Sequence, residues 1–186
     1  IDDFDLIIFD RYKRRGILPS LYLENIANYV RQGGAVLVSA GPDFAGADSL
    51  FRTPLGDVLP ATPTARVIDA PYLPFVTDIG NRHPVTTGLP QNGDWGRWLR
   101  QIDVTPTSGN IVMTGIEDRP LLILDRVDEG RVALLASDHA WLWNRGYEGG
   151  GPQLELLRRL AHWMMGEPEL EEEALTATAE GQTMRI

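Results

Sequence analysis

The 186-residue sequence contains no cysteine. Without a thiol the chain forms no disulfide, offers no thiolate nucleophile and builds no cysteine-ligated zinc site. It also lacks any apolar run near the roughly 20 residues that a membrane-spanning helix needs. These absences predict a soluble domain and exclude cysteine-based catalysis, but they leave the cellular compartment open.

Positive charge is scarce, with 17 Lys and Arg residues against 26 Asp and Glu residues and a net charge of −9. Binding to nucleic acid requires concentrated positive charge, so we expect no nucleic-acid partner. The local basic run of residues 11–15 is typical of a solvated loop. Residues 167–186 hold six acids and one base. We therefore predict one domain over residues 1–166, followed by an acidic linker or the start of another segment over residues 167–186.

The first 40 residues carry the pattern of a strand, a helix and a second strand. Leu6–Phe9 is a continuous apolar run of the buried-strand type. An amphipathic helix follows, with Ser20 as its candidate N-cap and Gly33-Gly34 as its stop. Ala35–Ser39 is the next apolar run. This order predicts two parallel strands joined by a right-handed helical crossover.

The second half changes to closely spaced strands with short turns. The predicted strands are Arg66–Ile68, Leu99–Thr105, Ile111–Thr114, Pro120–Asp125 and Arg131–Ser137. A hairpin turn at residues 128–130 makes the last two antiparallel. A final helix begins near Pro152 and stops at Gly166. We predict a three-layer α/β fold of the flavodoxin or Rossmann type, whose mixed sheet adds antiparallel strands to a parallel core.

Three residues are candidates for catalysis. Asp43 lies in the glycine-bounded turn after Ala35–Ser39, at the end of a parallel strand where ligands of open α/β sheets collect. The alternative is that Asp43 is an Asx-type turn residue that binds its own backbone. Asp138 and His139 follow the last strand, where a histidine beside a carboxylate could act as a general base. The alternative for this pair is structural anchoring of the loop that follows.

Candidate ligand-binding residues are Trp141, Trp143 and His83. Tryptophans in a loop can line a pocket, or they can cap the open end of a sheet. His83 precedes a proline in a loop, where a lone histidine is more often structural than a ligand. We predict no metal site and no cofactor.

Several motifs resemble those of a known family. They are Tyr29–Val38, the turn Gly41–Gly46, Thr53–Pro60, His83–Leu89 and the stretch from Gly130 through Asp138 to Trp141. Together they are similar to class I glutamine amidotransferase-like domains of large bacterial membrane-anchored proteins. The resemblance implies that the family's first strand and helix lie upstream of Ile1.

The resemblance also bears on activity. Class I amidotransferases use a cysteine in the turn after a strand and a histidine after a later strand; here Asp43 and His139 lie nearest those positions. Without a thiolate no glutamyl thioester can form, so we expect no glutaminase activity. Our leading hypothesis is a non-catalytic binding or scaffold module, whose partners are other domains of a membrane-associated parent chain or another protein.

Two alternatives stay open. In the first, the chain is a hydrolase or metal-dependent enzyme that uses Asp43, Asp138 and His139, which requires these side chains to converge in one cleft. In the second, the same cleft senses a small ligand with the help of Trp141 or Trp143. The sequence does not assign the side of the membrane on which such a domain would lie.

Overall fold

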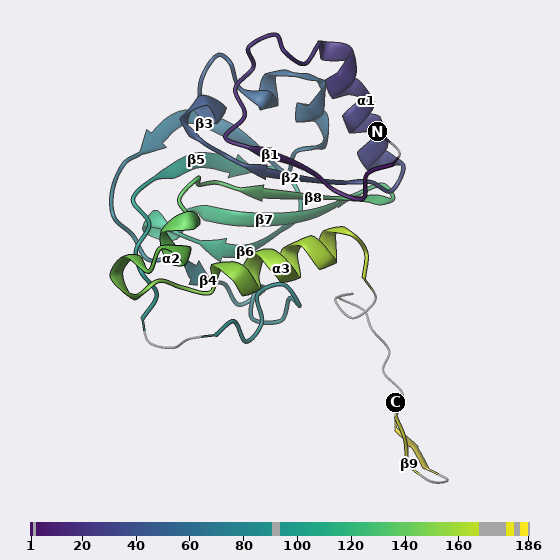
Figure 1. The fold of residues 1–186 in the computed structure, drawn as a ribbon, viewed down its shortest axis with the longest axis vertical. Coiled ribbons are helices and arrows are strands. Elements are labelled where there is room, and N and C mark those ends of the chain that lie inside the picture. Colours follow the sequence, from purple (N-terminus) through teal and green to yellow (C-terminus); the bar gives the residue numbers. More distant parts are fainter. Residues whose placement is uncertain (2, 91–93, 168–177, 181–182, 186) are drawn as a thin grey trace.

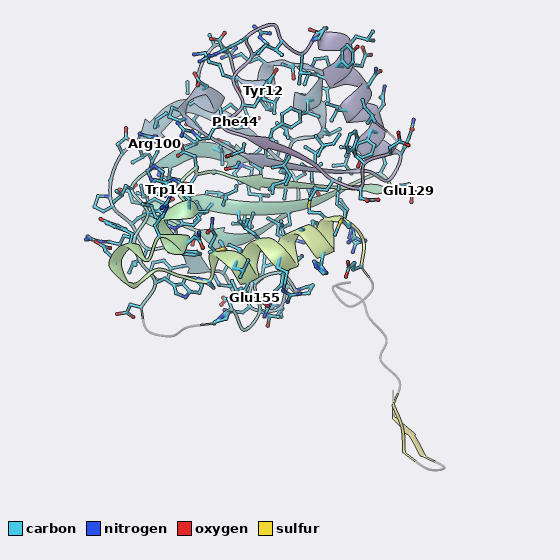
Figure 2. The ribbon with its side chains drawn as sticks, in the orientation of Figure 1. Tyr12, Phe44, Arg100, Glu129, Trp141 and Glu155 are labelled. Atoms are coloured by element: carbon cyan, nitrogen blue, oxygen red, sulfur yellow. The ribbon has the colours of Figure 1, made fainter. Side chains whose placement is uncertain are left out.

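A computed structural model describes residues 1, 3–90, 94–167, 178–180 and 183–185. Within these ranges no helix combines the length and the apolar character needed to cross a membrane. The main body is a sheet with helices on both of its faces, and side chains fill the layers on either side (Figures 1 and 2).

The central sheet has six strands in the order β1-β2-β8-β7-β6-β4. Their bounds are Ile7–Asp10 for β1, Ala35–Ser39 for β2, Gly130–Leu135 for β8, Pro120–Val127 for β7, Asn110–Thr114 for β6 and Phe75–Val76 for β4. The pairs β1–β2 and β2–β8 are parallel, and the remaining pairs are antiparallel. The predicted mixed sheet, with a parallel part and added antiparallel strands, is confirmed.

Helix α1 (Ser20–Arg31) covers one face of the parallel strands and buries Leu23, Ile26 and Val30. The prediction that Ser20 caps this helix is wrong, because Pro19 occupies the cap position and no side-chain cap hydrogen bond forms. Helix α3 (Gln153–Met164) lies against the other face and buries a broad apolar stripe (Figure 1). The two helices and the sheet form the three layers of the fold.

A second sheet pairs β3 (Ala61–Ile68) with β5 (Gln101–Pro106) in antiparallel orientation. We expected residues 99–105 to add to the mixed sheet, and this expectation is wrong because their ladder is made with β3. Strand β3 also begins five residues before the predicted strand at Arg66. A bulge between Pro63 and Val67 interrupts its alternation and hid its first half from the sequence pattern.

The remaining elements are short. Helix α2 (Trp141–Asn144) follows β8, and β9 (Thr178–Glu180) pairs with β10 (Thr183–Arg185) near the C-terminus. The described residues also form five 3-10 turns, at Pro42–Ala45, Leu50–Arg52, Pro54–Val58, Ile116–Asp118 and Tyr147–Gly149. The acidic run of residues 169–173 lies outside the described residues, so the predicted linker stays a prediction.

Candidate functional site

The carboxyl ends of the three parallel strands meet at one edge of the sheet. Asp10 is the last residue of β1, Ser39 is the last residue of β2, and Asp138 follows the end of β8 by three residues. The backbone N–H of Arg11 donates to the carbonyl of Ser39 at 2.9 Å, which ties the two strand ends together. Ligands of open α/β sheets bind at such an edge.

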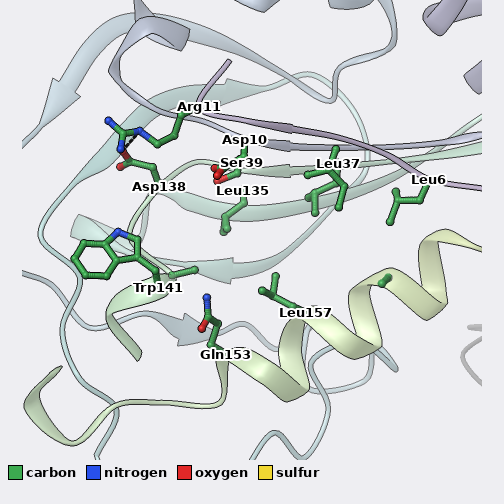
Figure 3. A pocket seen from close by; sticks show the side chains of 13 residues that line it. Leu6, Asp10, Arg11, Leu37, Ser39, Leu135, Asp138, Trp141, Gln153 and Leu157 are labelled. Carbon is green, nitrogen blue, oxygen red and sulfur yellow. Dashed lines mark ion pairs between the residues drawn. The ribbon is translucent and has the colours of Figure 1, made fainter. Parts of the chain in front are cut away.

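A cleft of about 490 Å³ opens at this edge, between the face of β1, β2 and β8 and helix α3 (Figure 3). Its walls are largely apolar, and polar side chains gather near the strand ends. The apolar lining residues are Leu6, Ile8, Leu37, Leu135, Ala140, Leu157 and Ala161, and those with a polar group are Asp10, Arg11, Ser39, Asp138, Trp141 and Gln153. We call this space the α3 cleft.

Asp138 is the most buried charged group of the α3 cleft, with a side chain only 2% exposed. Its Oδ2 atom lies 3.0 Å from Nε of Arg11 and 3.6 Å from Nη1 of Arg100. Its Oδ1 atom is buried without a hydrogen bond. A buried carboxylate requires such pairing, because removing an unpaired charge from water is costly. Arg11 and Arg100 therefore supply the partners of the buried Asp138 carboxylate at the sheet edge.

Both ring nitrogens of His139 face protein atoms, and Nδ1 makes a hydrogen bond. Its Nδ1 atom accepts the backbone N–H of Leu99 at 3.2 Å, so the neutral ring carries its proton on Nε2. That Nε2 atom faces Oδ1 of Asp138 at 3.7 Å. Burial lowers the pKa of His139, while the charge of Asp138 opposes this shift. A general base needs an unprotonated nitrogen facing its substrate, and this arrangement offers none.

Asp43 lies in the 3-10 turn that follows β2, in a neighbouring hollow of about 510 Å³. Its carboxylate accepts a hydrogen bond from Nζ of Lys13 at 2.9 Å. This contact raises the pKa of Lys13, since it favours the charged ammonium group. In the described part of the chain, no hydrogen bond or ion pair joins Asp43 to Asp138 or His139.

The structure thus brings Asp138 and His139 together and places Asp43 in the adjoining hollow. Among the residues that are described, no three acidic or histidine side chains are grouped so that they could hold a metal ion.

The three candidate ligand-binding residues have different surroundings. Trp143 is 3% exposed; its Nε1 donates to the carbonyl of Gly96 at 2.6 Å, and its ring packs on two other tryptophans. His83 is 4% exposed, and its Nδ1 accepts the N–H of Val85 at 3.2 Å. Trp141 is 51% exposed and lines the α3 cleft. Trp143 and His83 therefore lie in the core, and Trp141 lies at the cleft.

Sequence reasoning did not select Asp10, Arg11 and Gln153 as site residues. Asp10 carries the signal that selected Asp43, namely an acid at the end of an apolar parallel strand. Arg11 has a φ of 49°, a left-handed conformation that costs a non-glycine residue about 1–3 kcal/mol. Gly41 leaves room for this conformation, since a Cβ there would lie 3.3 Å from Cγ of Arg11. Gln153 reaches the cleft only through tertiary packing of α3.

The layered fold and the site at the edge of its parallel strands define an amidotransferase-like α/β domain. The chain belongs to the GATase1_like family, described as "Putative glutamine amidotransferase", whose family model matches residues 6–147. The family that the sequence motifs indicated is thereby confirmed. No curated protein matches the chain.

Solved structures with the same fold include two proteins of Salmonella typhimurium. "Cytoplasmic Protein STM3548" is 18% identical with a TM-score of 0.72, over 88% of this chain and 72% of that chain. "Cytoplasmic Protein STM1381" is 20% identical with a TM-score of 0.72, over 87% and 72%. A ThuA-like protein of Parabacteroides merdae is 16% identical with a TM-score of 0.56, over 89% and 71%. At these identities the similarity establishes the fold.

Proposed function

We propose that this domain is a non-catalytic amidotransferase-like module that binds a ligand or a protein partner and does not hydrolyse glutamine. One observation carries the proposal. The turn after β2, where the family places its cysteine nucleophile, holds Asp43, whose carboxylate is engaged by Lys13 at 2.9 Å. The chain contains no cysteine that could replace it from elsewhere. A thioester intermediate therefore has no atom on which to form.

The other groups at the sheet edge support the same proposal. Both ring nitrogens of His139 face protein atoms, so this histidine holds the loop after β8 in place. The hydroxyl of Ser39 donates to the carbonyl of Ser137 at 3.3 Å. A serine nucleophile needs a base within hydrogen-bond reach, and in the described ranges no side chain fills that role for Ser39.

The α3 cleft is the surface through which we propose that the module binds. Its volume of about 490 Å³ lies within the range of small-molecule pockets, and its mixture of apolar walls and a few polar groups is typical of them. The resemblance to domains of large bacterial membrane-anchored proteins supports a membrane-associated parent, in which other domains are the natural partners.

The test is a coupled assay for ammonia release from L-glutamine, run on the full chain and on His139→Ala. We expect neither protein to exceed the rate measured in buffer. A wild-type rate that His139→Ala abolishes would overturn the proposal. Hydrolysis of ester or amide substrates that is lost in both Asp43→Asn and Asp138→Asn would instead support the hydrolase alternative.

A further inference from the structure

The polar end of the α3 cleft carries groups that the protein leaves unsatisfied. Asp10 is exposed, and within the described residues its carboxylate makes no hydrogen bond and no ion pair. The same holds for the side-chain amide of Gln153 and for the indole N–H of Trp141. Figure 3 shows Asp10, Trp141 and Gln153 among the side chains that line the cleft, and Asp10 is the ladder partner of Ser39 at the strand ends. Converging polar groups beside an apolar wall are typical of a ligand site.

The charges at this end leave one negative charge uncompensated. Arg11 pairs with Asp138, and Arg100 pairs with Asp69 at 2.7 Å and with Asp138 at 3.6 Å. Of the charged side chains that line the cleft, Asp10 and Asp138 are acidic and Arg11 is basic, and Arg11 pairs with Asp138. Because both arginines are already held by other acids, Asp10 is the group left to meet a ligand. A cationic or hydrogen-bond-donating group fits this position.

Trp141 strengthens the preference for a cation. Its ring is 51% exposed and lines the same cleft. The face of a tryptophan ring attracts a cation that lies within about 6 Å of its centre. Asp10 and Trp141 line the same cleft, so both the carboxylate and the indole favour a ligand that carries a positive charge.

The rest of the cleft favours a ligand whose remaining part is apolar. Leucine and isoleucine side chains of β1, β2 and β8 form one wall, and Leu157 and Ala161 of α3 form the other. Ile8 is 57% exposed there, although an isoleucine in a parallel strand is usually covered. A bound aliphatic or aromatic group would remove this apolar surface from water.

We propose that the α3 cleft binds a small amphiphilic amine, with its apolar body between β1, β2 and α3 and its ammonium group at Asp10 and Trp141. This inference rests on the proposed function, because it assigns the cleft to binding. It adds the chemical class of the ligand.

The test compares three probes of equal length, n-hexylamine, 1-hexanol and hexanoate, titrated at pH 7 into the full isotope-labelled chain. We expect hexylamine to bind about tenfold more tightly than either control, and to shift the indole signal that Trp141→Phe removes. Asp10→Asn should abolish most of this preference. Asp5→Asn should preserve it, because Asp5 is exposed and does not line the cleft.

Ala161→Phe fills the cleft and should weaken binding of all three probes, provided that its circular dichroism matches the wild type. Equal affinity for the three probes, tighter binding of hexanoate, or no binding would each overturn the amine assignment. These outcomes concern probe affinity alone, whereas the proposed function is tested by ammonia release from glutamine. Failure of this inference is therefore distinguishable from failure of the proposed function.

Discussion

At the scale of single residues, Asp43 and Asp138 follow two neighbouring parallel strands and have different environments. The Asp43 side chain is 43% exposed and binds one lysine, whereas the Asp138 side chain is 2% exposed and is held by two arginines. An exposed ion pair contributes little to stability, because water and salt screen it. A buried carboxylate depends on its partners, so Asp138 is the structural residue of the pair.

Replacing Asp138 by Asn keeps the volume and removes the charge. We expect the free energy of unfolding to fall by about 1–3 kcal/mol, since charge-assisted hydrogen bonds contribute in this range. The matched control is Asp69→Asn, which removes the other partner of Arg100 at a side chain that is 66% exposed. That change should cost less than about 1 kcal/mol. Urea unfolding of both variants measures the difference, and equal losses would contradict the assignment.

His139 gives the fold a defined pH dependence. Burial lowers its pKa in the folded state, so the unfolded chain binds a proton at a pH where the folded chain does not. The free energy of unfolding should therefore decrease as the pH falls below about 6.5, the ordinary pKa of histidine. Denaturant unfolding between pH 7.5 and pH 5 should show a shallower decrease for His139→Gln. Identical pH profiles for the two proteins would show that His139 does not titrate in this way.

At the scale of elements, the hairpin of β7 and β8 depends on a close approach to the end of α1. Gly130 begins β8, and a Cβ at this position would lie 1.9 Å from the carbonyl oxygen of Val30 and 2.5 Å from that of Gly34. Both contacts are with backbone, which cannot rotate away as a side chain can. The predicted turn at residues 128–130 therefore needs glycine because α1 lies against it.

Gly130→Ala should lower the free energy of unfolding by more than about 2 kcal/mol, at the upper end of what overpacking costs. Gly46→Ala is the control, since a Cβ there would lie 3.5 Å from its nearest neighbour and its φ is −96°. The control should change stability by no more than about 0.5 kcal/mol. Thermal and urea unfolding of both variants provide the measurement, and a Gly130→Ala variant as stable as the control would disprove the close approach.

Sequence patterns predicted the elements that local hydrophobicity defines. The first strand, α1 and β2 were predictable because each is a single apolar run or stripe, and glycine or proline borders α1 and β2. The pairing of β3 with β5 was not predictable. A bulge breaks the pattern of β3, and more than 30 residues separate β3 from β5 in the sequence. Register between distant strands depends on tertiary packing, which a local pattern does not contain.

At the scale of the whole molecule, the sheet separates two hydrophobic clusters. One lies with α1 and the 3-10 turns, and the other lies with α3 and the long loops. Helix α3 does not cover Ile8 of β1, and the uncovered space beside this residue is part of the α3 cleft. Sequence reasoning found Asp138, His139 and Trp141 of this region from strand ends. It could not predict the cleft itself, since its walls come from residues about 150 positions apart.

The two clusters also predict where the domain ends. Their buried members lie between Phe9 and Met164, and the last described contact of the body joins His162 to Glu167 at 2.7 Å. A chain that stops after Glu167 should therefore keep its melting temperature within about 2 °C of the full chain. A chain that stops after Gly151 loses the buried Leu156, Leu160 and Trp163 and should not fold. Calorimetry of the three chains decides the boundary. A loss of more than about 5 °C on removing residues 168–186 would extend the domain beyond residue 167.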